Sequence, residues 1–384
     1  KGIMMRNILK VTVLALAFLS LGACGDKDNA PTPKPLAKNI AADLKVEPIW
    51  KNSVGNGAFV ANLRYQLAQN KQNIYVSAYN GSVSLLNSQT GSVIWKKTYK
   101  TTFSSGASIG EDALYIGTSD GKVYALALKD GSTLWQAQTA GSIQSKIAVS
   151  GDKVVVYSHN GDLSAFSKQA GQLIWQVPHV NNDFLLEGDS SPVIANDQVV
   201  MAYHNGDVSS FDLDTGKFLW TRPIAIVSGD NQVAQMVDII ADPVVRDGIV
   251  YLVAYHGNAV AMQLRDGQLL WQKPLSSFRN MALSDKALFV VNDKSVLVAL
   301  DKNTGSVLWQ QKDLLNRRLS APVLLSSSVA VADYAGFIHF LALDDGHILA
   351  RAQLGSLPLL LSSNQDHMLY AYSQSASLAA LKVQ

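Results

Sequence analysis

"DGSTLWQ", the stretch from Asp130 to Gln136, returns through the chain with small changes. "TGSVIWK" precedes it, and "AGQLIWQ", "TGKFLWT", "DGQLLWQ" and "TGSVLWQ" follow it. Each copy ends at or just after a Trp, and the full set is Trp50, Trp95, Trp135, Trp175, Trp220, Trp271 and Trp309, with spacings of 45, 40, 40, 45, 51 and 38 residues. Self-similarity at about 40 residues predicts a solenoid or a propeller.

The internal pattern of each copy favours the propeller. In "GKVYALALKDGSTLW" a β-rich segment, a turn at Gly131 and a second segment ending in Trp135 read as a hairpin. Two further apolar segments precede each hairpin, such as "DALYIGTS" and "DKVVVYSHN". About four short strands per 40 residues is typical of a propeller blade. Beyond the N-terminal segment, no apolar stripe has the period of a helix.

The strands are apolar on both faces, as in "KVYALAL", where Val123 and Tyr124 point to opposite sides. A sheet covered on one side would alternate apolar with polar residues. Stacked blades cover both sides, so we expect each repeated Trp to lie between one blade and the next. A ring of Trp side chains that binds a ligand is the alternative.

Counting the hairpins predicts how the ring closes. Seven hairpins end at positions 95, 135, 175, 220, 271, 309 and 350, and an eighth begins at Leu378–Leu381 with no outer strand after it. Trp50 has the form of an outer strand without a hairpin before it. The sequence therefore predicts an all-β, eight-bladed propeller over residues 45–384, with four antiparallel strands per blade. Its N-terminal strand should complete the C-terminal blade, join the two ends and leave no open edge across the ring.

The N-terminal segment has the pattern of a secretory signal. Basic Arg6 and Lys10 precede an eleven-residue apolar run, Val11–Leu21, and Cys24 follows small residues. The site resembles the lipobox of bacterial lipoproteins, in which the cysteine becomes the acylated first residue; an ordinary signal with an incidental cysteine is the alternative. We expect a signal peptide at 1–23 and a lipidated Cys24. A Pro-rich flexible tether should follow over residues 24–44.

Composition excludes several classes of protein. Charged residues make up 16% of the 384 residues and the net charge is +2, so no basic surface points to nucleic acid. The single cysteine excludes a disulfide framework.

The repeats resemble those of quinoprotein dehydrogenases. The whole mature chain resembles the propeller lipoproteins of the outer-membrane β-barrel assembly machine, notably in "WKNSVGNG" from Trp50, "KDLLNRRLSAPVL" from Lys312 and "GFIHFLALDDG" from Gly336. The resemblance implies a scaffold without catalytic residues or cofactor. It implies a protein anchored to the outer membrane, facing the periplasm and binding the periplasmic domains of the central subunit, BamA. It further implies a role in presenting unfolded outer-membrane barrel precursors.

The resemblance also assigns the partner contact to two segments, "FLLEGDSSP" from Phe184 and "VDIIADP" from Val237. Both lie where the Trp spacing exceeds 40 residues, and long connections on a rigid scaffold are natural binding loops. The expected partner-binding residues are Phe184, Leu186, Glu187, Asp238 and Ile240. Glu187 stands where the family has Arg, and Ile240 where it has Asp, so the charges at this contact differ from the family's. Packing of these residues inside the protein is the alternative.

Other functions have weaker support in the residues. Quinoprotein enzymes carry an adjacent cysteine pair over the cofactor, which one cysteine cannot supply. His159, His204 and His256 each precede a repeat Gly and are interpreted as turn residues with local hydrogen bonds, since no pair has metal-ligand spacing. A small ligand or peptide bound in the central channel remains the alternative function. Blade edges could also pair with an extended client strand.

Overall fold

The computed structural model describes residues 31–38, 40, 43–54, 67–179, 188–224, 238–354, 358–364, 367–373 and 375–384. The chain divides into two compact units, residues 1–32 and Pro33–Gln384, and the second contains the described fold. The expected signal peptide and Cys24 lie outside the described residues. In the described ranges no helix has the length and apolar character needed to cross a membrane.

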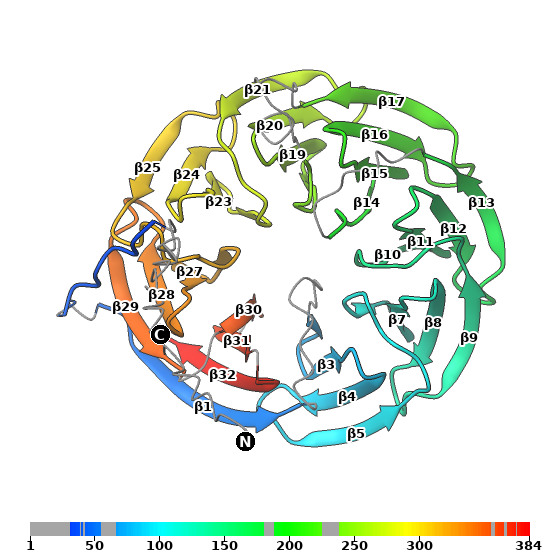
Figure 1. The fold of residues 1–384 in the computed structure, drawn as a ribbon, viewed down its shortest axis with the longest axis horizontal. Coiled ribbons are helices and arrows are strands. Elements are labelled where there is room, and N and C mark those ends of the chain that lie inside the picture. Colours follow the sequence, from blue (N-terminus) through cyan, green and yellow to red (C-terminus); the bar gives the residue numbers. More distant parts are fainter. Residues whose placement is uncertain are drawn as a thin grey trace, which may run out of the picture. The chain divides into compact units, whose positions relative to one another are not determined.

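The body is an eight-bladed β-propeller, as the repeat count predicts (Figure 1). Every blade is an antiparallel four-stranded sheet whose first strand lies nearest the centre. Blades 1 to 4 consist of β2 (Ala68–Gln69), β3 (Asn73–Ser77), β4 (Ser82–Asn87), β5 (Val93–Thr98); β6 (Ser108–Ile109), β7 (Ala113–Gly117), β8 (Lys122–Ala127), β9 (Thr133–Gln138); β10 (Ala148–Ser150), β11 (Lys153–Tyr157), β12 (Leu163–Ser167), β13 (Leu173–Val177); and β14 (Val193–Ala195), β15 (Gln198–Ala202), β16 (Asp207–Asp212), β17 (Phe218–Pro223).

The second half of the ring repeats the same order. Blades 5 to 8 consist of β18 (Val244–Arg246), β19 (Ile249–Val253), β20 (Asn258–Gln263), β21 (Leu269–Pro274); β22 (Ala282–Leu283), β23 (Ala287–Val291), β24 (Leu297–Asp301), β25 (Val307–Gln311); β26 (Val323–Leu324), β27 (Ser328–Ala332), β28 (Phe337–Ala342), β29 (Ile348–Gln353); and β30 (Pro358–Ser363), β31 (Met368–Ser373), β32 (Ser377–Val383) with β1 (Val46–Ser53).

The N-terminal strand closes the ring, as the sequence predicts. β1 runs antiparallel along β32, with Val46 opposite Val383 and Ser53 opposite Ser377. In Figure 1 the blue β1 forms the outermost strand beside the red β32. The first and last strands of the body are thus held in one sheet, and β32 has a neighbouring strand on each side.

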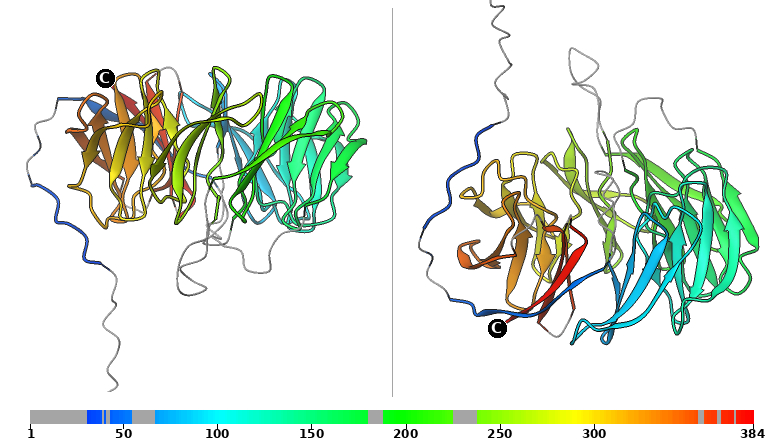
Figure 2. Two further views of the ribbon diagram at one scale, coloured as in Figure 1. Left: turned by 90° about the horizontal axis from the view of Figure 1, so that it is seen from above. Right: turned by 60° about the horizontal axis from the view of Figure 1, so that its bottom comes forward.

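The core lies between blades because the middle strands are buried on both faces. All five residues of β11 are buried, and those of β15 are buried after the first. One apolar cluster joins Val200 and Val208 of blade 4 to Val250 and Val260 of blade 5. The strands therefore need apolar residues at consecutive positions, which explains the run seen in the sequence. Figure 2 shows the ring edge-on, with the strands of each blade crossing its thickness.

Each repeated Trp contacts the next blade around the ring. Its indole Nε1 donates a hydrogen bond of 2.8 to 3.1 Å to a backbone carbonyl there, and the acceptors are Ser88, Leu128, Lys168, Leu213, Leu264, Lys302 and Leu343. The ring plane covers the turn glycine of that blade: a Cβ placed on Gly267 would lie 2.7 Å from Cε3 of Trp220. The Gly and Trp that recur in one stretch are therefore the two halves of a repeated contact between blades.

The segment before the first strand differs from the expected flexible tether. Arg317 Nη1 donates to the Lys34 carbonyl and Arg351 Nη1 to the Ala37 carbonyl, both at 3.0 Å. Lys34 Nζ lies 2.6 Å from Asp313 Oδ1, and Leu36 packs on the core between blades 6 and 7. The described part of residues 33–44 is therefore fixed to the propeller. Its described residues from Lys34 to Ala37 are not a free tether, because blade side chains bind their backbone carbonyls. Residues 24–30, 39, 41 and 42 of the expected tether lie outside the described residues.

Candidate functional site: the roots of two long connections

Two long inter-blade connections begin and end on the same face of the ring. In the antiparallel blades, the start of the first strand, the end of the second, the start of the third and the end of the fourth share one edge. The described ends of the connections from β13 to β14 and from β17 to β18 therefore lie on the face that carries the β11–β12 and β15–β16 turns. We call this the connection face. The structure describes the ends of these connections, residues 178–179 with 188–192 and 224 with 238–243.

His204 joins the two connections. It lies in the β15–β16 turn, and its side chain is only 3% exposed. Its Nε2 lies 2.8 Å from Asp189 Oδ1, in the first connection, and its Nδ1 lies 2.8 Å from Asp238 Oδ1, in the second. Both nitrogens face carboxylates, so without another cation the imidazole holds two protons and donates from both.

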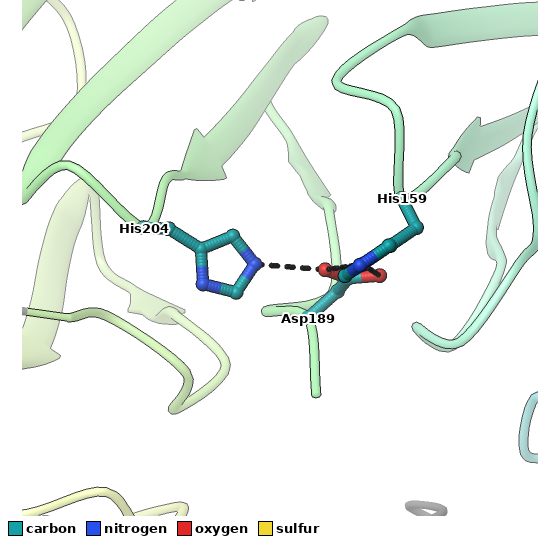
Figure 3. A group of neighbouring side chains, drawn as sticks. All are labelled: His159, Asp189 and His204. Atoms are coloured by element: carbon teal, nitrogen blue, oxygen red, sulfur yellow. Dashed lines mark hydrogen bonds and ion pairs between the residues drawn. The ribbon is translucent and has the colours of Figure 1, made fainter. Parts of the chain in front are cut away.

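A second histidine reaches the same carboxylate. His159, in the β11–β12 turn of blade 3, has its Nδ1 3.0 Å from Asp189 Oδ1 and 3.3 Å from Oδ2. Figure 3 shows the two imidazoles approaching Asp189 from opposite sides. Asp189 is fully buried, whereas the His159 side chain is 35% exposed. We call His159, Asp189, His204 and Asp238 the His–Asp cluster; it links blades 3 and 4 to both connections.

The electrostatics of the His–Asp cluster follow from this pairing. Burial lowers the pKa of His204, but the hydrogen bonds and charges of Asp189 and Asp238 outweigh burial and raise it to about 9. The hydrogen bond to Asp189 raises the pKa of His159 above its usual value. Burial opposes ionisation of Asp189, yet the hydrogen bonds from both histidines hold its pKa below the usual range. Among the described residues, His159, Asp189 and His204 form the group whose side-chain atoms could hold a metal ion.

Backbone and side-chain contacts below the cluster also join the connections. Ser190 Oγ donates to the Ala241 carbonyl at 3.1 Å, and the Ser191 amide donates to Asp242 Oδ1 at 2.8 Å. Asn280 Nδ2 donates to Asp242 Oδ2 at 2.8 Å. The two roots therefore form one fixed structure across blades 4, 5 and 6.

The structure places the expected partner-binding residues unevenly. Phe184, Leu186 and Glu187 lie outside the described residues. Asp238 is 3% exposed and Ile240 is 6% exposed, and Asp238 forms an isolated β-bridge with Tyr255. In the free protein these two side chains shape the root of their connection.

The interpretation of the histidines as locally bonded turn residues is wrong for two of them. His159 and His204 do lie in turns, but their partners are 15 to 34 residues away in sequence. His256 lies in the equivalent turn of blade 5, stacks on Tyr255 and does not join the cluster. The sequence analysis does not identify Asp189 as a site residue. The available signal was the shared repeat position of His159 and His204, because equivalent turns of neighbouring blades lie side by side.

The comparisons with known proteins give the family. The profile of the outer membrane protein assembly factor BamB matches residues 50–311. The chain belongs to the BamB family. It is 38% identical to the BamB of Legionella pneumophila over 383 residues, which are 98% of this chain and 99% of that protein. It is 40% identical to the BamB of Alkalilimnicola ehrlichii, covering 97% of both chains.

Solved structures show where the fold recurs. The BamB of Moraxella catarrhalis superposes with a TM-score of 0.80 at 24% identity, covering 88% of this chain and all of that one. A europium-containing methanol dehydrogenase superposes with a TM-score of 0.70 at 13% identity, covering 88% of this chain and 93% of that one. At these identities the likeness concerns the propeller alone. Membership of the BamB family rests on the sequence matches.

Proposed function

We propose that this protein is a non-catalytic scaffold lipoprotein that binds the periplasmic domains of BamA and assists the folding and insertion of outer-membrane β-barrels. It would be held on the periplasmic side of the outer membrane by the acylated Cys24. Its relatives are named outer membrane protein assembly factors, which supports this role. The family resemblance further suggests unfolded barrel precursors as its clients.

One observation supports placing the BamA contact on these connections: His204 fixes the roots of both connections to each other. Two loops whose bases cannot move apart lose less conformational entropy when they bind one partner together. We propose that Phe184, Leu186 and Glu187 make the direct contact. Asp238 and Ile240, being buried, would hold the second connection in place for it.

The test is binding between the full lipidated chain in detergent and the purified periplasmic domains of BamA. Glu187→Arg should weaken the affinity at least tenfold, because a charge in a specific contact usually contributes that much. The matched control is Asp344→Arg, an equal charge reversal at an exposed turn on the opposite face. Unchanged affinity for Glu187→Arg would move the contact away from this connection.

Asp238→Arg is a poor test of the same contact, although the sequence suggests it. The Asp238 carboxylate now balances the charge of His204. An arginine there would place a second positive charge beside His204, and an unpaired buried charge destabilises a fold strongly. Loss of binding in that variant would not separate contact from unfolding.

A small ligand in the central channel is the second candidate function. A hollow there is lined by residues in or directly before the innermost strands of blades 1, 2, 3 and 8, including Gln69, Ser108, Lys146 and Ser362. Burial lowers the pKa of Lys146. An anionic small molecule would fit this lining, and binding measured by calorimetry should then disappear in Lys146→Gln.

A further inference from the structure

We propose that His159, Asp189 and His204 form a binding site for one divalent metal ion of the zinc class on the connection face. The three side chains come from the β11–β12 turn, the first long connection and the β15–β16 turn. One ligand atom from each lies within 4.8 Å of the other two. Figure 3 shows both imidazoles directed to the Asp189 carboxylate, which lies between them.

The donor set fits this class of ion. Zinc binds imidazole nitrogen and carboxylate oxygen at about 2.0 to 2.2 Å, and three protein ligands leave one position for water. Ligand atoms around such an ion are roughly 3.3 Å apart. His204 Nε2 and His159 Nδ1 already lie 2.8 and 3.0 Å from Asp189 Oδ1. The two nitrogens, at most 4.8 Å apart, need to approach each other by no more than about 1.5 Å.

Asp238 supplies the outer support that metal-binding histidines usually have. Its Oδ1 accepts a hydrogen bond from His204 Nδ1 at 2.8 Å, on the side of the ring away from Asp189. Such a carboxylate fixes the tautomer in which the other nitrogen is free to bind the ion, and it makes that nitrogen a better donor. Asp238 is itself buried and held by its bridge to Tyr255.

The charges and the access route are also suitable. Asp189 and Asp238 are buried carboxylates, and one divalent cation with two neutral imidazoles would balance them. The ion would replace the protons now placed on His159 Nδ1 and His204 Nε2, so its binding releases them to solvent. The His159 side chain is 35% exposed and leaves an entry route from solvent, while the other two ligands lie beneath it.

A bound ion would fix the root of the first connection to blade 3 as well as to blade 4. Hydrogen bonds to His159 and His204 already hold Asp189 there, and an ion would replace them with stronger bonds. If these connections carry the BamA contact, the ion would hold that contact in shape; this consequence rests on the proposed function. The metal site itself does not depend on it.

The test is a titration of the untagged, full-length, metal-free protein with Zn²⁺ in competition with a chromogenic chelator. We expect one ion per chain. His159→Gln and His204→Gln should each lower the affinity at least a hundredfold, and Asp238→Asn about ten- to a hundredfold, the usual effect of removing outer support. Co²⁺ in place of Zn²⁺ should give visible absorption bands of nitrogen and oxygen ligation, which the same variants lose.

His256→Gln is the matched control, because His256 occupies the equivalent turn of blade 5 outside the cluster. Its affinity for Zn²⁺ should equal that of the wild type. If His204→Gln fails to fold, His159→Gln keeps both carboxylate contacts of His204 and still removes a ligand. No saturable Zn²⁺ binding, or binding unchanged by His159→Gln, would overturn the proposal and leave the cluster held by protons alone. Since BamA is absent from the experiment, that result would not affect the scaffold proposal.

Discussion

At the scale of single residues, the recurring Trp and Gly act as one unit. The indole of Trp220 donates to the Leu264 carbonyl at 2.8 Å and lies flat on Gly267, whose φ is +68°. Glycine is required there for two separate reasons, since the backbone is left-handed and the space above it is filled. A left-handed turn needs glycine even where no Trp contacts it, so the two effects can be measured separately.

A pair of glycine variants separates these two reasons. Gly248 also has a left-handed φ, +73°, but nothing lies within 4 Å of an added Cβ. We expect Gly248→Ala to lower the free energy of unfolding by about 1 kcal/mol, the cost of the left-handed backbone. Gly267→Ala should lower it by roughly 2 to 4 kcal/mol, because the Trp ring must also move. Urea denaturation followed by Trp fluorescence measures both, and equal losses would show that the Trp contact adds nothing.

A buried histidine in blade 7 predicts a loss of stability in acid. His339 is fully buried; its Nε2 donates to Asp333 Oδ2 at 3.0 Å, and its Nδ1 accepts from Arg351 Nε at 3.3 Å. Burial lowers its pKa below the usual value, with the charge of Asp333 only partly opposing this. The unfolded chain therefore takes up this proton first, as pH falls through about 6.5. Stability is complete above that pH and decreases below it.

Replacing His339 should flatten this dependence. We expect the free energy of unfolding of His339→Gln, measured by urea denaturation, to decrease less between pH 7.5 and 5 than that of the wild type. The two slopes should differ by up to about 1.4 kcal/mol per pH unit. His347→Gln is the control, because His347 lies on the same blade with half of its side chain exposed. Identical slopes for wild type and His339→Gln would refute the assignment.

At the scale of strands, the ring is closed by pairing rather than by a covalent bond. The Val54 amide donates to the Ala376 carbonyl at 2.8 Å. The next opposed pair, Ser53 and Ser377, is therefore a non-hydrogen-bonded pair of the antiparallel ladder. The Cα atoms of such a pair are about 4.5 Å apart, within the range that a disulfide spans.

A cross-link at this position tests closure directly. Ser53→Cys combined with Ser377→Cys should oxidise to an intramolecular disulfide. The oxidised protein should unfold at higher denaturant than the same protein after reduction, by a few kcal/mol. The reduced form is its own control. Failure to oxidise, or equal midpoints in both forms, would contradict the register between β1 and β32.

The strands were predictable from the sequence and the His–Asp cluster was not, for a physical reason. Blade number and closure depend on local turns and on short runs of consecutive apolar residues, which repeat about every 40 residues and can be counted. His204 depends on partners 15 and 34 residues away, and only the ring brings these together. The segment around Lys34 was mispredicted for the same reason. Its composition predicts a tether, but Arg317, 283 residues away in sequence, binds the Lys34 carbonyl.

At the scale of the whole molecule, the proposed anchor and the propeller should be separable. The described body has its own core and its own closure, and Lys34, Ala37 and Asp43 of the segment before β1 are bonded to it. An acyl chain adds membrane affinity of about 0.8 kcal/mol per buried CH₂ without adding contacts to the blades. Anchoring and folding should then depend on different residues.

Cys24→Ser tests this separation. We expect the variant to leave salt-washed membranes for the soluble periplasmic fraction, because it cannot be acylated, while the wild type stays bound. Its melting temperature should match that of the wild type within about 1 °C, since the core clusters of the described body are made by blade residues and the substitution changes none of them. Asn29→Ala, further along the same segment, should remain with the membranes. If the Cys24→Ser variant stays in the membranes, attachment comes from the propeller. If the variant no longer folds, the acyl chain is part of the fold.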